Sequence, residues 1–180
     1  MANFAVSVAV IRDEQILLTR REDFEIWCLP GGIVDENESL AQAAIREVRE
    51  ETGALVELNS LVGIYSRLGG MRDEHAVIFR GIQTGGELRI QNGETIEVTY
   101  FPFDRLPDEI LLGQKRRILD AIQNRQSIAV RQEERNSHAN RISRSELYRL
   151  RDQSGLSRRE FYLQAVRDVE IEDIIEVGDQ

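Results

Sequence analysis

The 180-residue sequence contains a single cysteine, Cys28, and only three prolines. One cysteine excludes an intramolecular disulfide and favours a reducing, cytoplasmic location. Because Cys28 follows Trp27 in an apolar stretch, we interpret it as a small buried hydrophobic residue rather than a nucleophile. No apolar run approaches the length of a membrane span, and residues 1–4 lack the basic start of a signal peptide. The sequence therefore predicts a cytoplasmic protein without a membrane contact.

Lysine is almost absent as well, because Lys115 is the only one and the other basic side chains are arginines. The net charge of −9 argues against a general affinity for nucleic acid. An anionic substrate would need metal ions and locally placed arginines, whose guanidinium groups suit bidentate contacts with phosphate. The length predicts one domain, with or without an appendage.

A loop followed by a helix is predicted between Gly32 and Ala54. Pro30-Gly31-Gly32 can only form a turn, since proline fixes φ and glycine allows positive φ. Ser39 is a suitable N-cap, the next thirteen residues favour a helix, and Gly53 ends it. At 100° per residue, one stripe of this helix is apolar and faces the core, formed by Leu40, Ala41, Ala44, Ile45 and Val48.

Three carboxylates, those of Glu47, Glu50 and Glu51, lie on one flank of this helix. Two of them border the apolar stripe, whereas Arg46 and Arg49 are predicted to point away, towards solvent. Unpaired carboxylates at a half-buried edge repel one another unless a cation neutralises them, and oxygen ligands suit a hard ion such as Mg²⁺. A solvated acidic face would explain Glu50 alone, but it explains all three poorly.

These residues carry a family resemblance. Gly32, five residues, Glu38, seven residues and then Arg46-Glu-Val-Arg-Glu-Glu-Thr-Gly-Ala54 resemble the signature of the Nudix hydrolases at every fixed position. The one soft departure is Ala54, where the family usually has a bulkier aliphatic residue. The resemblance covers about residues 3–125 and implies a mixed α/β fold, the Nudix αβα sandwich, as a domain over 1–125.

The resemblance also implies a reaction, the Mg²⁺-dependent hydrolysis of a nucleoside diphosphate linked to another moiety, with Mn²⁺ as a substitute ion. Water attacks one phosphorus of the pyrophosphate in a substrate similar to ADP-ribose or in a nucleoside triphosphate. Glu47 is our choice of general base. Glu38 and Arg46 are expected to pair and fix the loop on the helix, which puts Arg46 with the catalytic residues. The implied metal ligands are Glu47, Glu50, Glu51 and the backbone carbonyl of Gly32.

Substrate-binding residues are expected outside this motif. In the family, an arginine at the end of the second strand commonly reaches substrate phosphates, and Arg21 matches it better than Arg20. The alternative for both arginines is a solvated strand edge. A further acid often comes from late in the domain, for which Glu94 and Glu97 are candidates, although each would equally serve as a plain charge at a strand end.

The rest of the domain alternates strands and helices. A hairpin, three further strands and a closing helix suit a mixed sheet between helices. They are predicted at 4–11, 15–19, 55–65, 76–81, 97–101 and 106–123. Trp27 is expected in the core or in a pocket wall.

Residues 126–180 form a predicted C-terminal helical extension. Capping boxes at Ser143 and Ser157 predict helices over 144–153 and 158–168. The pair resembles a helix-turn-helix, so a nucleotide-sensing regulator whose C-terminal helices bind DNA or a protein is the alternative function. A helical hairpin that packs on the core, or on a second subunit of a homodimer, is the simpler interpretation. Residues 169–171 alternate like an edge strand, which would suit a dimer contact.

Overall fold

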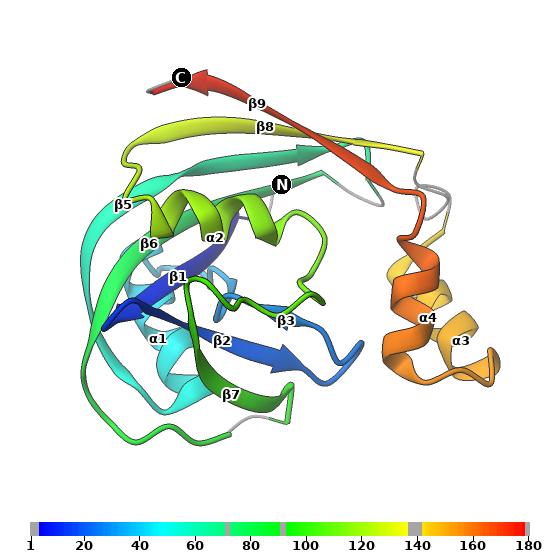
Figure 1. The fold of residues 1–180 in the computed structure, drawn as a ribbon, viewed down its shortest axis with the longest axis horizontal. Helices are drawn as coiled ribbons and strands as arrows, with labels where there is room; N and C mark the ends of the chain where they lie inside the picture. Colours follow the sequence, from blue (N-terminus) through cyan, green and yellow to red (C-terminus); the bar gives the residue numbers. More distant parts are fainter. Residues whose placement is uncertain (1–3, 71–72, 91–92, 137–141, 179–180) are drawn as a thin grey trace.

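The structure is a computed structural model that describes residues 4–70, 73–90, 93–136 and 142–178. Its strands form one nine-stranded sheet, and helices cover both faces (Figure 1). The strands are β1 (Phe4–Arg12), β2 (Gln15–Arg21), β3 (Trp27–Cys28), β4 (Gly31–Ile33), β5 (Leu55–Leu68), β6 (Glu74–Gly85), β7 (Thr95–Pro102), β8 (Ile128–Arg135) and β9 (Glu170–Val177). The helices are α1 (Leu40–Thr52), α2 (Gln114–Ile122), α3 (Arg144–Gln153) and α4 (Arg158–Ala165).

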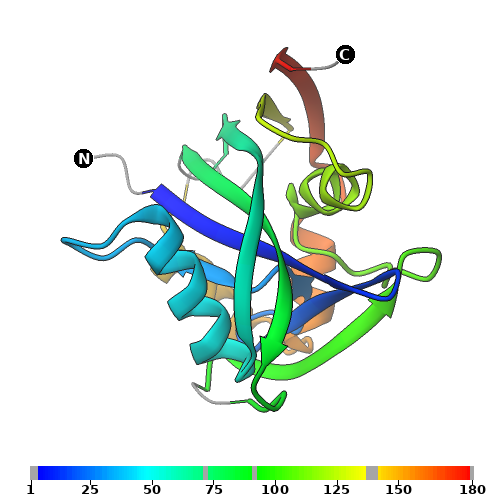
Figure 2. The same ribbon diagram turned by 90° about the vertical axis from the view of Figure 1, so that its left-hand side faces the viewer.

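The sheet bends sharply at the β1–β2 hairpin. Along its main path the order is β3-β2-β1-β6-β5-β8-β9, with β4 paired to β1 and β7 to β2. Strands β1 and β2 pair only at the hairpin, where Ile11 faces Ile16 and Arg12 faces Gln15. Beyond that corner the two strands separate, β1 joining the parallel β6 and β2 the antiparallel β7. The sheet therefore has two halves that diverge from one corner, as Figure 2 shows.

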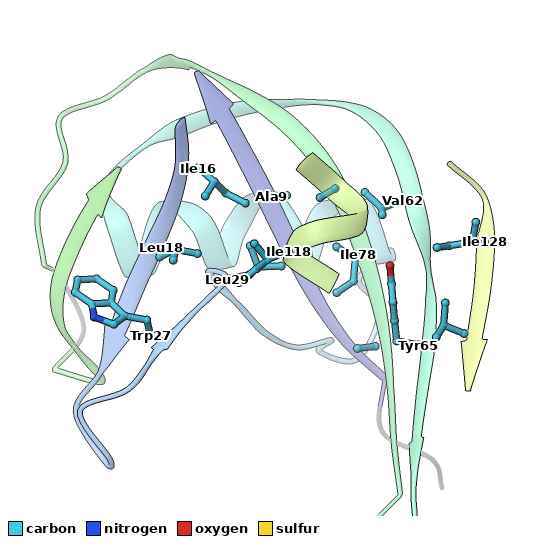
Figure 3. Close-up of a cluster of buried hydrophobic side chains, with 13 residues drawn as sticks. Ala9, Ile16, Leu18, Trp27, Leu29, Val62, Tyr65, Ile78, Ile118 and Ile128 are labelled. Carbon is cyan, nitrogen blue, oxygen red and sulfur yellow. The ribbon is translucent and has the colours of Figure 1, made fainter. Parts of the chain in front are cut away.

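Two apolar cores lie on either side of the sheet. Under α1, the side chains of Val6, Val8, Leu17 and Val48 are fully buried. The opposite core holds Ile118 of α2 between the diverging halves, together with the side chains drawn in Figure 3. The sequence prediction of a mixed α/β sandwich is therefore confirmed.

Trp27 and Cys28 both belong to the interior. Trp27 packs in the core beside α2, with its ring edge-on to Phe101 at 4.7 Å between centroids. Cys28 is buried, and burial raises the pKa of its thiol to about 11. A thiol that stays protonated is a poor nucleophile, which supports the interpretation of Cys28 as a packing residue.

The last helix of the domain is shorter than predicted. It begins at Gln114 rather than near Leu106, because Gly113 has a left-handed backbone with φ of 83°. The preceding segment is irregular and runs beside β3, with a bridge between Ile110 and Trp27. The apolar residues of this segment are therefore core residues without being helical.

The C-terminal extension contains strands as well as the two predicted helices. Helix α3 has the predicted bounds and α4 ends three residues earlier than predicted. Strand β8 was not predicted, and β9 is longer than the three residues expected. The helices pack on the domain through an apolar cluster that includes Phe24, Ile26 and Tyr162. Within the described ranges, no helix is long and apolar enough to cross a membrane.

Candidate active site

Helix α1 is held at both ends by the residues that the sequence indicated. The Ser39 hydroxyl accepts the Gln42 N–H at 3.2 Å, and the Gln42 side chain accepts the Ser39 N–H at 2.9 Å. At the other end, Gly53 adopts φ of 75° and donates its N–H to the Arg49 carbonyl. These caps satisfy backbone groups that a helix leaves unpaired, and they fix where the helix starts and stops.

The buried face of α1 is rotated from the predicted stripe. Leu40 and Ile45 are 38% and 40% exposed, so the prediction that they face the core is wrong. Ala41 is exposed as well, whereas Ala44 and Val48 are buried as predicted, together with Ala43 and Thr52. This arc contains the helical positions of Glu47 and Glu51, which brings both carboxylates onto the packed side of the helix rather than its border.

Glu51 is the most enclosed of the three acids. Its Oε2 accepts the backbone N–H of Gly31 at 3.1 Å, from the turn before the helix. Burial raises the pKa of Glu51 to about 8, and the charge of Glu47 adds to the shift. Without a nearby cation this carboxyl would hold a proton at neutral pH.

Glu47 lies directly against the glycine turn. A Cβ placed on Gly32 would come within 2.5 Å of the Glu47 carboxylate, so only glycine leaves room for that side chain. Burial raises the pKa of Glu47, and Arg46 offsets part of this effect. The Glu47 carboxylate therefore packs against the backbone of the turn at Gly32.

Arg46 faces the carboxylates, so the prediction that it points to solvent is wrong. Its guanidinium donates to both oxygens of Glu38 at 2.9 Å, which confirms the expected pair. It also donates to Glu47 at 2.9 Å and to Glu50 at 3.1 Å. One arginine thus joins the loop to the helix and neutralises two of the three acids.

A divalent ion fits this set of residues. Among the described residues, no three acids, histidines or cysteines are close enough together to form a ready metal site, since Arg46 lies between Glu47 and Glu50. The donors are nevertheless all hard oxygens, and Glu51 is a buried acid without an arginine hydrogen bond in this structure. Such a group is ionised by a cation, and carboxylate oxygens suit Mg²⁺ or Mn²⁺.

The predicted substrate-binding residues separate into two groups. Arg21 forms two hydrogen bonds to Asp23, at 2.8 and 2.6 Å, and its charge acts on Glu51. Arg20 instead pairs with Glu97 at 3.4 Å. Arg21 therefore lies beside the acids, whereas Arg20 and Glu97 form a contact between strands β2 and β7.

Glu94 acts electrostatically on the acids of α1. Its charge raises the pKa of both Glu47 and Glu51. Of the two late acids named from the sequence, Glu97 pairs with Arg20, and Glu94 is the one with this effect on the carboxylates of α1.

Sequence reasoning missed Asp23, the partner of Arg21. Asp23 also accepts the Tyr148 hydroxyl of α3 at 2.9 Å, which connects the C-terminal extension to this arginine. The Arg-x-Asp spacing at the end of a strand was a usable signal for the first contact. The second joins residues 125 positions apart, and no local pattern indicates it.

Comparison with known proteins agrees with this geometry. Residues 1–122 match the NUDIX domain family. The chain is 36% identical over 126 residues to a putative 8-oxo-dGTP diphosphatase of Bacillus subtilis (strain 168), an alignment that covers 70% of this chain and 83% of the relative. It is 32% identical over 108 residues to an ADP-ribose pyrophosphatase of Methanocaldococcus jannaschii, which covers 57% of this chain and 63% of the relative.

Solved structures share the fold. An ADP-ribose pyrophosphatase from Streptococcus suis superimposes with a TM-score of 0.60 at 26% identity, over 69% of this chain and 92% of that chain. Residues 1–122, which match the NUDIX domain family, include the glycine turn, helix α1 and the strands that support them. The chain belongs to the NUDIX domain family, as the motif from Gly32 to Ala54 predicted.

Proposed function

We propose that this protein hydrolyses the pyrophosphate bond of a nucleoside diphosphate linked to another moiety, with water attacking one phosphorus. The observation that carries the proposal is that Glu47 and Glu51 lie against the glycine turn, while Arg46 binds Glu47 and Glu50 beside it. Hydrolysis of a polyanion needs positive charge at the phosphates and an activated water. The site offers acids that can hold a divalent ion and an arginine beside them.

Glu47, Glu50, Glu51 and the Gly32 carbonyl would hold Mg²⁺, with Mn²⁺ as a substitute. When bound, the ion would neutralise charge on the diphosphate and lower the pKa of water. Arg46 would then keep its two hydrogen bonds to Glu38 and hold the loop on the helix. Gly31 would hold the Glu51 carboxylate in place through its N–H.

Glu47 is the proposed general base. Burial raises the pKa of its carboxyl, which brings its basicity closer to neutral pH, where proton transfer is more effective. Arg21 is proposed to bind a substrate phosphate, since its planar guanidinium can exchange a carboxylate partner for a phosphate with similar geometry. Glu94 would help bind the ion or orient the water.

The relatives support two substrate classes. One is named for 8-oxo-dGTP and the other for ADP-ribose, and both of these molecules carry a diphosphate on a nucleoside. This shared feature supports the general substrate class proposed here. It leaves nucleoside triphosphates and ADP-ribose as the two classes that an assay must compare.

The test is phosphate release from a panel of nucleotides with Mg²⁺, with Mn²⁺ and with EDTA. The panel contains ADP-ribose, nucleotide sugars, dinucleoside polyphosphates, and normal and oxidised nucleoside triphosphates. Triphosphate reactions, which release pyrophosphate, are coupled to inorganic pyrophosphatase, whereas reactions of ADP-ribose, nucleotide sugars and dinucleoside polyphosphates are coupled to a phosphatase that acts on their products. We expect hydrolysis of one class that EDTA abolishes. A folded protein that is inactive on every compound would contradict the proposal.

A further inference from the structure

A cavity of about 330 Å³ lies between the C-terminal helices and the domain on which they pack. The domain contributes Arg21 and Phe24 from the end of β2 and Leu112 from the segment before α2. The extension contributes Phe161 and Ala165, among others. In Figure 1 helices α3 and α4 lie side by side at one end of the molecule, next to the end of β2. The cavity thus combines residues of the family domain with residues that lie outside it.

The wall formed by α3 and α4 is attached firmly. The Tyr162 hydroxyl accepts the Leu112 N–H at 2.7 Å, and Arg151 donates to the Asp23 carbonyl at 2.7 Å. The ring of Phe24 packs against Tyr162, with centroids 5.2 Å apart. Arg158 of α4 forms an ion pair with Glu22. These contacts hold the two helices at a fixed distance from the domain, so the cavity exists before any ligand binds.

The cavity is lined by both aromatic and charged residues. Phe24, Phe161 and Tyr162 are its aromatic residues. Arg67, which also lines it, forms ion pairs with Glu74 and Glu134, and its buried Nε–H has no hydrogen-bond partner among the described residues. A heteroaromatic base combines an apolar face with a polar edge that accepts hydrogen bonds. The volume is at the lower end of the range for small-molecule sites and suits one nucleoside.

Arg21 is both a residue of this cavity and the proposed phosphate ligand. It lines the cavity from the end of β2, where its guanidinium donates two hydrogen bonds to Asp23. A substrate whose diphosphate lies at Arg21 would therefore have its remaining part within reach of the cavity. Asp23, which holds Arg21, is itself held by Tyr148 of α3.

We propose that α3 and α4 form one wall of the substrate site and that the cavity binds the nucleoside of the substrate. The inference rests on the proposed function, because the diphosphate at Arg21 is the substrate group that directs the nucleoside there. It assigns specificity to residues 143–166, which lie outside the region that matches the family. Phe161 and Ala165 are the residues that would contact the nucleoside.

The test is calorimetric titration of the full chain with AMP and with GMP in the presence of Mg²⁺. Ala165→Trp would fill the cavity, so we expect it to weaken binding about tenfold or more. Leu163→Trp is the matched control, because Leu163 is on the same helix, does not line the cavity and is 39% exposed. Phe161→Ala, which removes a ring, is the second variant and is interpreted alone if Ala165→Trp unfolds.

The outcomes separate the two proposals. Unchanged affinity in the folded Ala165→Trp and Phe161→Ala variants would overturn the inference, as would a wild-type protein that binds neither monophosphate. If Ala165→Trp loses binding but the wild type hydrolyses nothing in the nucleotide panel, the cavity is a nucleoside site and the proposed hydrolysis is wrong. If hydrolysis occurs and KM rises in Ala165→Trp but not in Leu163→Trp, both stand.

Discussion

At the scale of single residues, the site depends on the contacts between the acids of α1 and the glycine turn that precedes this helix. Gly31 contacts Glu51 through a hydrogen bond, and Gly32 contacts Glu47 by leaving room for it. Arg46 binds the acids that the turn does not fix. Substitutions at these positions should therefore affect the reaction more than the fold.

Glu51→Gln should abolish turnover and leave the fold intact. The substitution keeps an oxygen that can accept the Gly31 N–H but removes the negative charge that would bind the ion. Activity on the substrate identified in the panel and circular dichroism are the measurements. A variant with wild-type activity would disprove the role of Glu51.

The same substitution should change how stability depends on pH in EDTA. The pKa of Glu51 is about 8 in the folded protein against an ordinary 4.5, so the unfolded chain releases this proton first. Between these values the wild type loses stability as pH rises, by at most about 1.4 kcal/mol per pH unit from this group. Glu51→Gln lacks this loss, so its free energy of unfolding should rise relative to that of the wild type from pH 5 to pH 8.

Urea unfolding at several pH values measures this effect. Glu50→Gln is the matched control, because it makes the same chemical change on the same helix at a side chain that is 53% exposed. Mg²⁺ should stabilise the wild type at pH 8 more than it stabilises Glu51→Gln. Parallel pH profiles for the wild type and Glu51→Gln would contradict the buried state of this carboxyl.

Gly32→Ala should lower activity with little change in stability. The added Cβ would displace the Glu47 carboxylate, which is the end of a flexible side chain and can move at low cost. We expect kcat to fall about tenfold or more while the unfolding temperature stays within about 2 °C. Gly85→Ala is the control, since its Cβ would make only ordinary contacts, the nearest at 3.5 Å.

At the scale of elements, the sequence predicted α1 to the residue but not the direction it faces. Capping residues act locally, so Ser39 and Gly53 set the ends of the helix correctly. Its buried face depends on what packs against it, and part of that surface comes from Val6, Val8 and Val10 of β1, which no pattern within the helix indicates. This is why Leu40 and Ile45 were wrongly assigned to the core and Arg46 to solvent.

The same reasoning explains the other errors. In β8 the buried residues alternate, but only Ile128 and Val130 are apolar, while Gln132 is polar and bonds to Gly113 and Asp173. A buried glutamine removes the period-two signal that a strand prediction needs. The predicted start of α2 was too early, because Gly113 was not recognised as the residue after which the helix begins.

Gly53→Ala should destabilise the C-terminal end of α1. Gly53 has φ of 75°, a left-handed conformation that costs a residue with a Cβ about 1 kcal/mol. Gly53→Asn should lose less, because asparagine tolerates this conformation better. Chemical denaturation of the three proteins at one pH is the measurement, and equal stability of the Ala and Asn variants would contradict the explanation.

At the scale of the whole molecule, ion pairs with the domain and within the helices account for much of the positive charge of the extension. Residues 126–168 contain nine arginines and six acids, a net charge of +3. In the structure Arg158 pairs with Glu22, Arg159 with Glu109, and Arg149 with Glu146 within α3. These arginines neutralise acids and help attach the extension.

A gel-shift test with duplex DNA should therefore show no retardation at physiological salt. The net charge of −9 repels a polyanion, and the arginines that could offset it are largely engaged. Retardation that salt weakens would favour the regulator as the function of the extension. The wild-type chain is sufficient for this measurement, with free DNA as the reference.

Strand β9 closes one side of the sheet with four acids among its eight residues. An exposed strand edge offers unpaired backbone groups to any other strand, and proteins with such edges are prone to aggregate. Two copies of this edge would bring acidic side chains together, so we expect the acids of β9 to disfavour pairing between copies, although Glu172 and Glu176 also form ion pairs with Arg135 and Arg131 of β8. Replacing its acids by threonine would keep the strand and expose the molecule to that hazard.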